Sequence, residues 1–222
     1  IRNFEYDDAR SYYKKWYQPN LMGLFVIGDV DVNEIKNIIT ESFSSFENND
    51  VTIPNYKIPD FKENQFFKYQ DEETERITFS LWEKTDFKKL NNFDNYKDDR
   101  IYNLISDIYQ RRIDELLEKN ELAFLNSGLG NSQVSDLDEY KTVSVTLNEA
   151  KINEGIIDFL TFIKQIEKFG FLNSELDLAK KNYLQYLKQN IIDEETRSSE
   201  SYVNEYQRHF LNDEMISSSE DQ

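Results

Sequence analysis

Apolar residues in the first part of the chain follow two different spacings. Over residues 5–17 they recur at helical intervals and Pro19 ends the pattern, which predicts an amphipathic helix. The run at 21–27, Leu-Met-Gly-Leu-Phe-Val-Ile, is continuously apolar and predicts a short central strand buried on both faces. Asp31, with Glu34 three positions later, has the capping-box pattern that begins a helix. The inward positions expected in the two helices are Tyr6, Ala9, Tyr12, Tyr13, Trp16, Ile35, Ile38, Ile39, Phe43 and Phe46.

Strand and helix patterns then follow one another along the rest of the chain. Residues 47–62 contain the two remaining prolines and predict a linker or extended crossing segment. Alternation predicts strands near 64–70, 76–83, 121–128 and 138–147, and helical spacing predicts helices near 96–119, 151–168, 174–192 and 197–211. We expect Gly170 to close the second of these helices.

This order of elements predicts an α+β fold in which a mostly antiparallel sheet has helices packed on one face. The 222 residues can bury a sizeable core, so we expect a single domain over 1–222 with a polar tail at 212–222. The sequence starts with Ile-Arg-Asn and ends in "ISSSEDQ", so we expect a segment excised from a longer polypeptide.

Charge and composition exclude several classes of function. The net charge of −17 opposes docking on nucleic acid or on an anionic membrane surface. No stretch approaches the about 18 consecutive apolar residues that a membrane span needs. The absence of cysteine removes disulfides and thiolate metal sites without fixing the compartment.

Residues that could carry chemistry are few. The lone histidine, His209, predicts a solvated or hydrogen-bonded side chain, because a catalytic zinc site normally takes three protein ligands. "DVDVNE" at 29–34 starts like a calcium loop, but Glu34 stands where that loop needs glycine, which leaves helix capping as the interpretation. "NSGLGNS" at 126–132 lacks the spacing of a phosphate loop and predicts a turn or a strand bulge.

Arg112 is the candidate site residue of this chain. On the helix predicted near 96–119 it falls on the same face as Ile101, Ile105 and Ile108. One interpretation is an arginine that extends past the core or pairs with one of the many acids. The other is an inward arginine that binds a carboxylate or carbonyl of the substrate or of a neighbouring domain, so that Arg112→Ala would weaken docking more than folding.

Residues 12–46 resemble the insulinase–pitrilysin family of zinc metallopeptidases, the inverted zincins, and most closely its bacterial, envelope-associated branch. The matching residues are Tyr17, Pro19, Asn20, Met22, Gly28, Asp29 and Phe43. A second segment at 170–187 is similar to the family's Gly-x-x-x-x-Glu-Leu-x-x-Ala-Lys pattern through Gly170, Glu175, Leu176, Ala179 and Lys180. With the tail at 198–214, the resemblance covers roughly residues 4–214.

The resemblance implies a non-catalytic domain that follows the zinc domain and helps to enclose a peptide-binding chamber. Zinc is implied for the parent's catalytic domain, where a His-x-x-Glu-His motif would hold it, whereas this chain lacks the motif and no metal or catalytic residue is expected here. The implied partners are that zinc domain, the parent's other half and a peptide substrate, and the implied location is the periplasm or cell envelope. The alternative is a scaffold or binding subunit of the same fold whose parent has no metal site.

Overall fold

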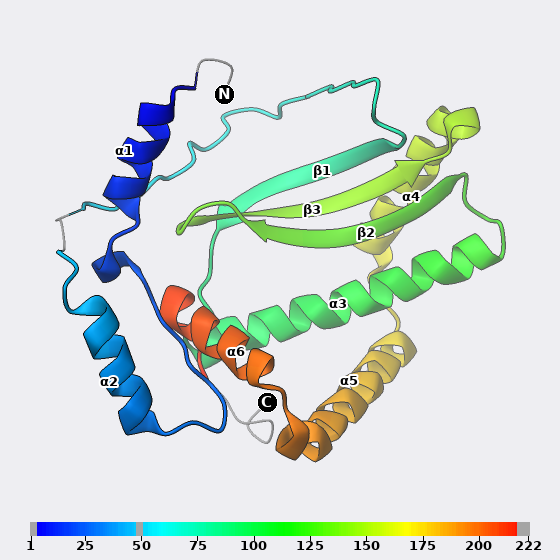
Figure 1. Cartoon of the computed structure of the whole chain (residues 1–222). Helices are drawn as coiled ribbons and strands as arrows, with labels where there is room; N and C mark the ends of the chain where they lie inside the picture. Colours follow the sequence, from blue (N-terminus) through cyan, green and yellow to red (C-terminus); the bar gives the residue numbers. More distant parts are fainter. Residues whose placement is uncertain (1–3, 48–50, 217–222) are drawn as a thin grey trace. The chain divides into compact units, whose positions relative to one another are not determined.

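The structure, a computed structural model, describes residues 4–47 and 51–216 (Figure 1). Its described residues form two compact units. The first unit contains residues 4–55 and 193–216, apart from 48–50, and the second contains 56–192. Two compact units can belong to one domain or to two, so the expectation of a single domain over 1–222 stays a prediction. The end of the predicted polar tail, 217–222, lies outside the described residues.

The first unit consists of three α-helices and short 3-10 turns. The helices are α1 (Tyr6–Trp16), α2 (Val32–Phe43) and α6 (Ser199–Asn212), and the turns are η1 (Pro19–Leu21) and η3 (Glu194–Thr196). Asp31 begins α2 as predicted, because its carboxylate accepts hydrogen bonds from the backbone N–H groups of Asn33 at 2.8 Å and Glu34 at 2.9 Å. The three helices confirm the helical periodicity of the sequence.

The predicted central strand at 21–27 is not a strand within the described residues. Residues 22–27 are extended but lie in no sheet ladder, and Met22, Leu24 and Val26 are 47%, 57% and 45% exposed. The prediction of burial on both faces was therefore wrong for this structure. An apolar run specifies that its side chains should be buried, but the partner strands that make it a β-strand must come from elsewhere.

The second unit contains the sheet and three α-helices. The strands are β1 (Ile77–Asp86), β2 (Phe124–Gln133) and β3 (Asp138–Leu147), and the helices are α3 (Phe93–Glu118), α4 (Ile152–Phe169) and α5 (Asn173–Asp193), with the turn η2 (Glu149–Lys151). The strand order is β1-β3-β2 and both pairings are antiparallel. In Figure 1 the three strands lie side by side, α3 runs beside β2, and α4 lies behind the sheet. The predicted α+β fold is confirmed.

Two local predictions fail in this unit. Residues 64–70 form no strand, and Phe66 and Phe67 there are 82% and 90% exposed. The stretch 126–132 lies inside β2 rather than in a turn, and the irregularity of that strand falls between Phe124 and Asn126. Gly170 does close α4, with a φ of 65° that suits glycine.

The hydrophobic core lies between the sheet and the helices α3 and α4. Its buried residues are Tyr109, Ile113, Phe124, Val145, Leu147, Phe159 and Phe162. Phe159 is completely buried and meets Phe79 edge-to-face, with ring centroids 6.0 Å apart. Gly155 allows α4 to approach the sheet closely, because a Cβ there would lie 2.9 Å from Leu147 Cδ2. The core therefore fixes which face of the sheet the helices cover.

Candidate functional site

The face of the sheet that points away from α4 is rich in hydroxyl groups. Phe79 and Val145 are opposite one another and point to the core, so their neighbours along the strands point the other way. These neighbours, all at least partly exposed, are Thr78, Ser80, Thr142, Ser144 and Thr146. Hydroxyl groups can donate and accept hydrogen bonds without a fixed charge. Such a face can contact an extended peptide backbone without selecting its side chains.

An aromatic pair stands on the same face of the sheet. Trp82 on β1 is 64% exposed, and its ring meets that of Tyr140 on β3 edge-to-face at 5.7 Å. The two residues are not directly opposite, since Trp82 is opposite Thr142 and Lys84 is opposite Tyr140. A largely exposed indole beside hydroxyl groups provides apolar contact area with a polar edge, which suits contact with peptides. We take this hydroxyl face, with Trp82 and Tyr140, as the candidate site.

A buried charge cluster closes one end of the hydroxyl face. Asp138 is completely buried and accepts hydrogen bonds from the backbone N–H of Ile58 at 2.8 Å and the hydroxyl of Ser135 at 3.0 Å. Lys84 Nζ lies 3.0 Å from Asp138 Oδ1 and 2.6 Å from Asp60 Oδ1. Because Ile58 and Asp60 belong to the segment before β1, the cluster attaches that segment to the sheet.

The hydrogen bonds of this cluster shift the pKa values of its members. The hydrogen bond from the Ile58 N–H, with help from Lys84 and Ser135, holds the pKa of Asp138 below its ordinary value despite burial. Hydrogen bonds to Asp60 and Asp138 raise the pKa of Lys84. Sequence reasoning missed this cluster, since nothing distinguishes Asp138 among 43 acidic residues.

We expect the second unit to lose stability in acid through Asp138. Because the folded-state pKa of Asp138 is lowered, the contribution of its carboxylate to the free energy of unfolding is complete above the unfolded-state pKa, about 3.9. This contribution is lost as the pH falls through the folded-state pKa. Asp138→Asn should therefore be less stable than the wild type at pH 7 and less sensitive to pH below about 4. Urea unfolding across this pH range measures the stability at pH 7 and its dependence on pH. Asp136→Asn is the matched control, because Asp136 is an exposed neighbour. Equal acid sensitivity in Asp138→Asn and the wild type would contradict the assignment.

Arg112, the site residue predicted from the sequence, pairs with an acid inside the second unit. Its Nε and Nη2 both donate to the carboxylate of Glu175 on α5, and its guanidinium lies 4.8 Å from the ring centre of Phe171. The Glu175 carboxylate also accepts a hydrogen bond from the Leu172 backbone N–H at 2.6 Å. This side chain thus connects α3 to the start of α5. A contact of Arg112 with substrate or a neighbouring domain stays a prediction.

A small hollow of about 200 Å³ lies beside this ion pair. Arg111 contributes to its lining and donates from Nη2 to the backbone oxygen of Glu175 at 3.2 Å. Arg111 Nη2 also lies 3.1 Å from the carboxylate of Asp107. Both arginines are therefore engaged by acceptors of the same unit.

The other candidate residues have structural roles. His209 Nδ1 lies 2.7 Å from the backbone oxygen of Glu214, which confirms the expectation of a hydrogen-bonded side chain. Asp31 caps α2, as expected for the 29–34 stretch. Over residues 4–47 and 51–216 no three His, Cys, Asp or Glu side chains are grouped so as to hold a metal ion.

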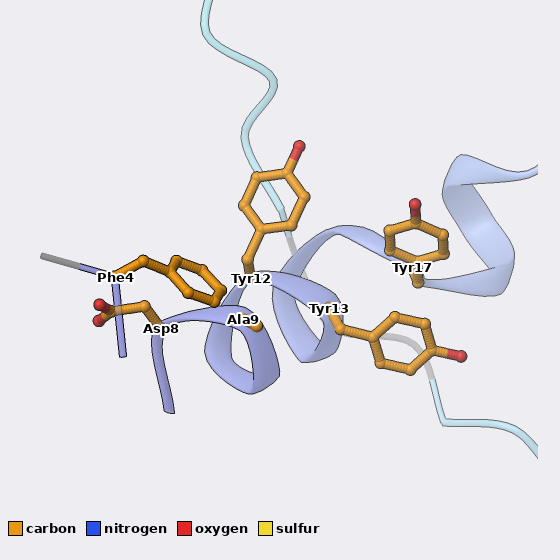
Figure 2. Close-up of a pocket in the computed structure, with 6 residues that line it drawn as sticks. All are labelled: Phe4, Asp8, Ala9, Tyr12, Tyr13 and Tyr17. Atoms are coloured by element: carbon orange, nitrogen blue, oxygen red, sulfur yellow. The ribbon is translucent and has the colours of Figure 1, made fainter. Parts of the chain in front are cut away.

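An open aromatic hollow of about 590 Å³ lies along α1 in the first unit (Figure 2). Its lining residues are Phe4, Asp8, Ala9, Tyr12, Tyr13 and Tyr17. Tyr12 and Tyr13, which the helical spacing predicts to face inward, are 62% and 60% exposed, and the rings of Tyr13 and Tyr17 stack at 4.7 Å. The apolar face of α1 is thus present but uncovered among the described residues.

Comparison with known proteins identifies the family. Residues 3–183, well over half of the chain, match the family described as the peptidase M16 inactive domain. The probable zinc protease PqqL of Escherichia coli K12 is 24% identical over 190 residues, which cover 84% of this chain and 20% of that protein. This confirms the resemblance to insulinase-type zinc peptidases.

Solved structures share the fold. The first half of the periplasmic protease PqqL from Escherichia coli matches with a TM-score of 0.77 and 20% identity, covering 96% of this chain and 46% of that one. A predicted insulinase family protease from Yersinia pestis matches with a TM-score of 0.75 and 17% identity, covering 99% and 48%. The chain thus spans about a fifth of PqqL and about half of each of these two solved chains. It belongs to the peptidase M16 family and, within that family, to the inactive domain.

Proposed function

We propose that this chain is the non-catalytic domain of a longer zinc metallopeptidase. It packs beside the parent's catalytic zinc domain and forms part of the wall of a chamber in which peptides are hydrolysed. The match of residues 3–183 to the inactive domain carries the proposal. By analogy with the periplasmic protease PqqL we place the parent in the periplasm. No helix among the described residues is long and apolar enough to cross a bilayer.

The hydroxyl face of the sheet is the part of this chain that we assign to the chamber wall. It offers uncharged donors and acceptors together with the exposed ring of Trp82, which fits contact with unfolded peptides of varied sequence. An extended peptide could also lie along a sheet edge, as peptides do in β-strand addition. The wall would hold the substrate while the zinc domain hydrolyses it.

Zinc does not fit the residues of this chain. The sequence holds one histidine and no cysteine, and catalytic zinc sites usually take three protein ligands. We therefore assign the metal to the parent's catalytic domain and derive no step of hydrolysis through residues of this segment.

The test is a comparison of the parent polypeptide with its Trp82→Ala variant. We expect about one zinc per parent chain, bound by three protein ligands, in both proteins. Loss of the indole should lower kcat/KM for a long unfolded peptide about tenfold, through a higher KM, because one buried aromatic contact is worth about 1.4 kcal/mol. Hydrolysis of a short peptide that does not reach the wall should be unchanged. Metal analysis and steady-state kinetics provide these values.

Three results would count against the proposal. A parent without zinc and without peptidase activity would favour the scaffold alternative. Equal kcat/KM of the two proteins for the long peptide would remove the hydroxyl face from the substrate path. Peptidase activity with stoichiometric zinc in the 222-residue chain alone would overturn the non-catalytic assignment.

A further inference from the structure

Helix α5 contributes nothing to the hydrophobic core of the second unit. The core residues and the apolar side chains packed against them come from the strands, from α3 and α4, and from the residue two positions before Phe124. Of the 21 residues of α5, two are buried, Ala179 and Leu187. Figure 1 shows α3 between α5 and the strands. Because helices in proteins gain most of their stability from packing an apolar face, α5 receives less of this stabilisation than α3 or α4.

Polar contacts with α3 hold α5 in place. At the start of α5, Glu175 is bound by Arg112 through its carboxylate and by Arg111 through its backbone oxygen. About two turns further along α5, the hydroxyl of Tyr183 lies 3.4 Å from Arg100 Nη1. All three arginines belong to α3. The attachment of α5 therefore depends largely on three long side chains of one neighbouring helix.

Two of these arginines carry buried polar atoms that the contact with α5 leaves unpaired. Arg100 Nε and Arg111 Nε are shielded from solvent and have no hydrogen-bond partner among the described residues. Arg111 also lines the hollow of about 200 Å³ between α3 and the start of α5. A buried N–H group without a partner costs free energy, which it regains when water reaches it. Separation of α5 from α3 would expose both atoms and so recover part of its own cost.

The two ends of α5 allow it to move as one body. Before it, Gly170 has a φ of 65°, and a Cβ there would meet no atom within 4 Å, so this turn lies in open space. After it, the chain passes at Asp193 into residues of the first unit. A helix between a glycine turn and a boundary between units can change its angle without distorting the strands.

We propose that α5 opens from α3 as a single element while the core and the hydroxyl face stay folded. It is then a movable connection between the core of the second unit and the C-terminal residues of the first. The residues of the core and of the hydroxyl face lie outside α5, so the opening leaves both as they are. The inference depends neither on zinc nor on peptidase activity, so its test is separate from that of the proposed function.

Hydrogen exchange of the parent polypeptide, in urea concentrations below the unfolding transition, tests this opening. Exchange through a local opening exposes little surface and depends weakly on urea, whereas exchange through global unfolding depends on it strongly. We expect the amides of residues 177–190 on α5 to share one degree of protection with a weak urea dependence. This protection should be at least about 100-fold lower than that of β3, which is paired on both sides and serves as the internal reference.

Two results of this measurement would overturn the inference. Equal protection and equal urea dependence in α5 and β3 would show that α5 separates only when the core unfolds. Protection that rises steadily from both ends of α5 to its centre would show fraying of helical turns instead of the opening of a whole helix.

Leu187→Ala and Leu184→Ala are matched variants of α5. Leu187 is 8% exposed, whereas Leu184 is 55% exposed. Loss of the buried side chain should raise the exchange rate along the whole of α5 at least about tenfold, because it weakens the packing that holds the helix. Leu184→Ala should change this rate by no more than about twofold. In both variants β3 should stay better protected than α5. An acceleration confined to the amides next to residue 187 would contradict movement as one element.

A covalent lock between the two helices completes the test. The chain has no cysteine, so cysteines introduced by Glu115→Cys on α3 and Leu178→Cys on α5 give a unique pair. Both positions line the hollow between the helices. Joining them with a short bismaleimide should slow the exchange of α5 at least about tenfold relative to the same double variant without the cross-link. An unchanged rate in the cross-linked protein would show that α5 exchanges without leaving α3 and would overturn the inference.

Discussion

Replacement of Phe159 by alanine is expected to lower the free energy of unfolding of the second unit by about 4 kcal/mol. Phe159 is 0% exposed at the centre of the core, where it meets Phe79 edge-to-face and packs between α4 and the sheet. The loss combines the transfer free energy of the ring with the cavity that it leaves. Urea unfolding measures the change, with Trp82 as the fluorescence reporter in a Trp16→Phe background.

The control lies two residues earlier on the same helix. Ile157 is 63% exposed, and Ile157→Ala should change stability by no more than about 0.5 kcal/mol. Equal losses in the two variants would mean that α4 does not pack on the sheet as described. A large loss in Phe159→Ala alone would establish that the second unit has a cooperative core.

Local pattern was enough to predict the helices and the three strands of the sheet, with the strand predicted at 121–128 displaced by a few residues from β2 (Phe124–Gln133). Val143, Val145 and Leu147 alternate with polar residues, and the strand predicted at 138–147 is β3 (Asp138–Leu147). The helix predicted at 96–119 is α3 (Phe93–Glu118), whose start is capped by Asn92. Periodicity and capping are properties of neighbouring residues, so one sequence is sufficient to find them.

The failures share a physical cause. The segments at 21–27 and 64–70 have apolar character suited to strands, but a strand exists only through its hydrogen-bonded neighbour. Among the described residues neither segment has one. Periodicity therefore identified side chains that need to be buried without locating the partner that buries them. The same limit hides the Asp138 cluster, in which Ile58 and Asp138 are 80 residues apart.

The family pattern at 170–187 now has a structural explanation within this chain. Gly170 adopts the positive φ that ends α4, and Glu175 receives hydrogen bonds from Arg112 and from the backbone of Leu172. Glu175 and Arg112 are 63 residues apart, so no local pattern could have paired them. The sequence did place Arg112 on the core-facing side of its helix, and the structure supplies the acid that binds it there.

We expect Arg112→Ala to lower the free energy of unfolding of the second unit by about 2 kcal/mol. The substitution removes two charge-assisted hydrogen bonds and leaves the Glu175 carboxylate without its cation, 22% exposed. The Arg112 hydrogen bond is also the main reason that the pKa of Glu175 lies below its ordinary value. Urea unfolding of Arg112→Ala, Glu175→Gln and the double variant measures the coupling between the two side chains.

A double variant that loses clearly less than the sum of the single losses would show that the pair stabilises the fold. Arg112→Lys should recover only part of the loss, since lysine keeps the charge but not the two-point hydrogen bonding. Lys88→Ala, which removes an exposed ion pair with Asp98, should have no measurable effect. Unchanged stability in Arg112→Ala, with weaker docking of this segment in the parent, would instead assign Arg112 to the contact with a neighbouring domain. The two interpretations of Arg112 thus predict opposite results in the same pair of measurements.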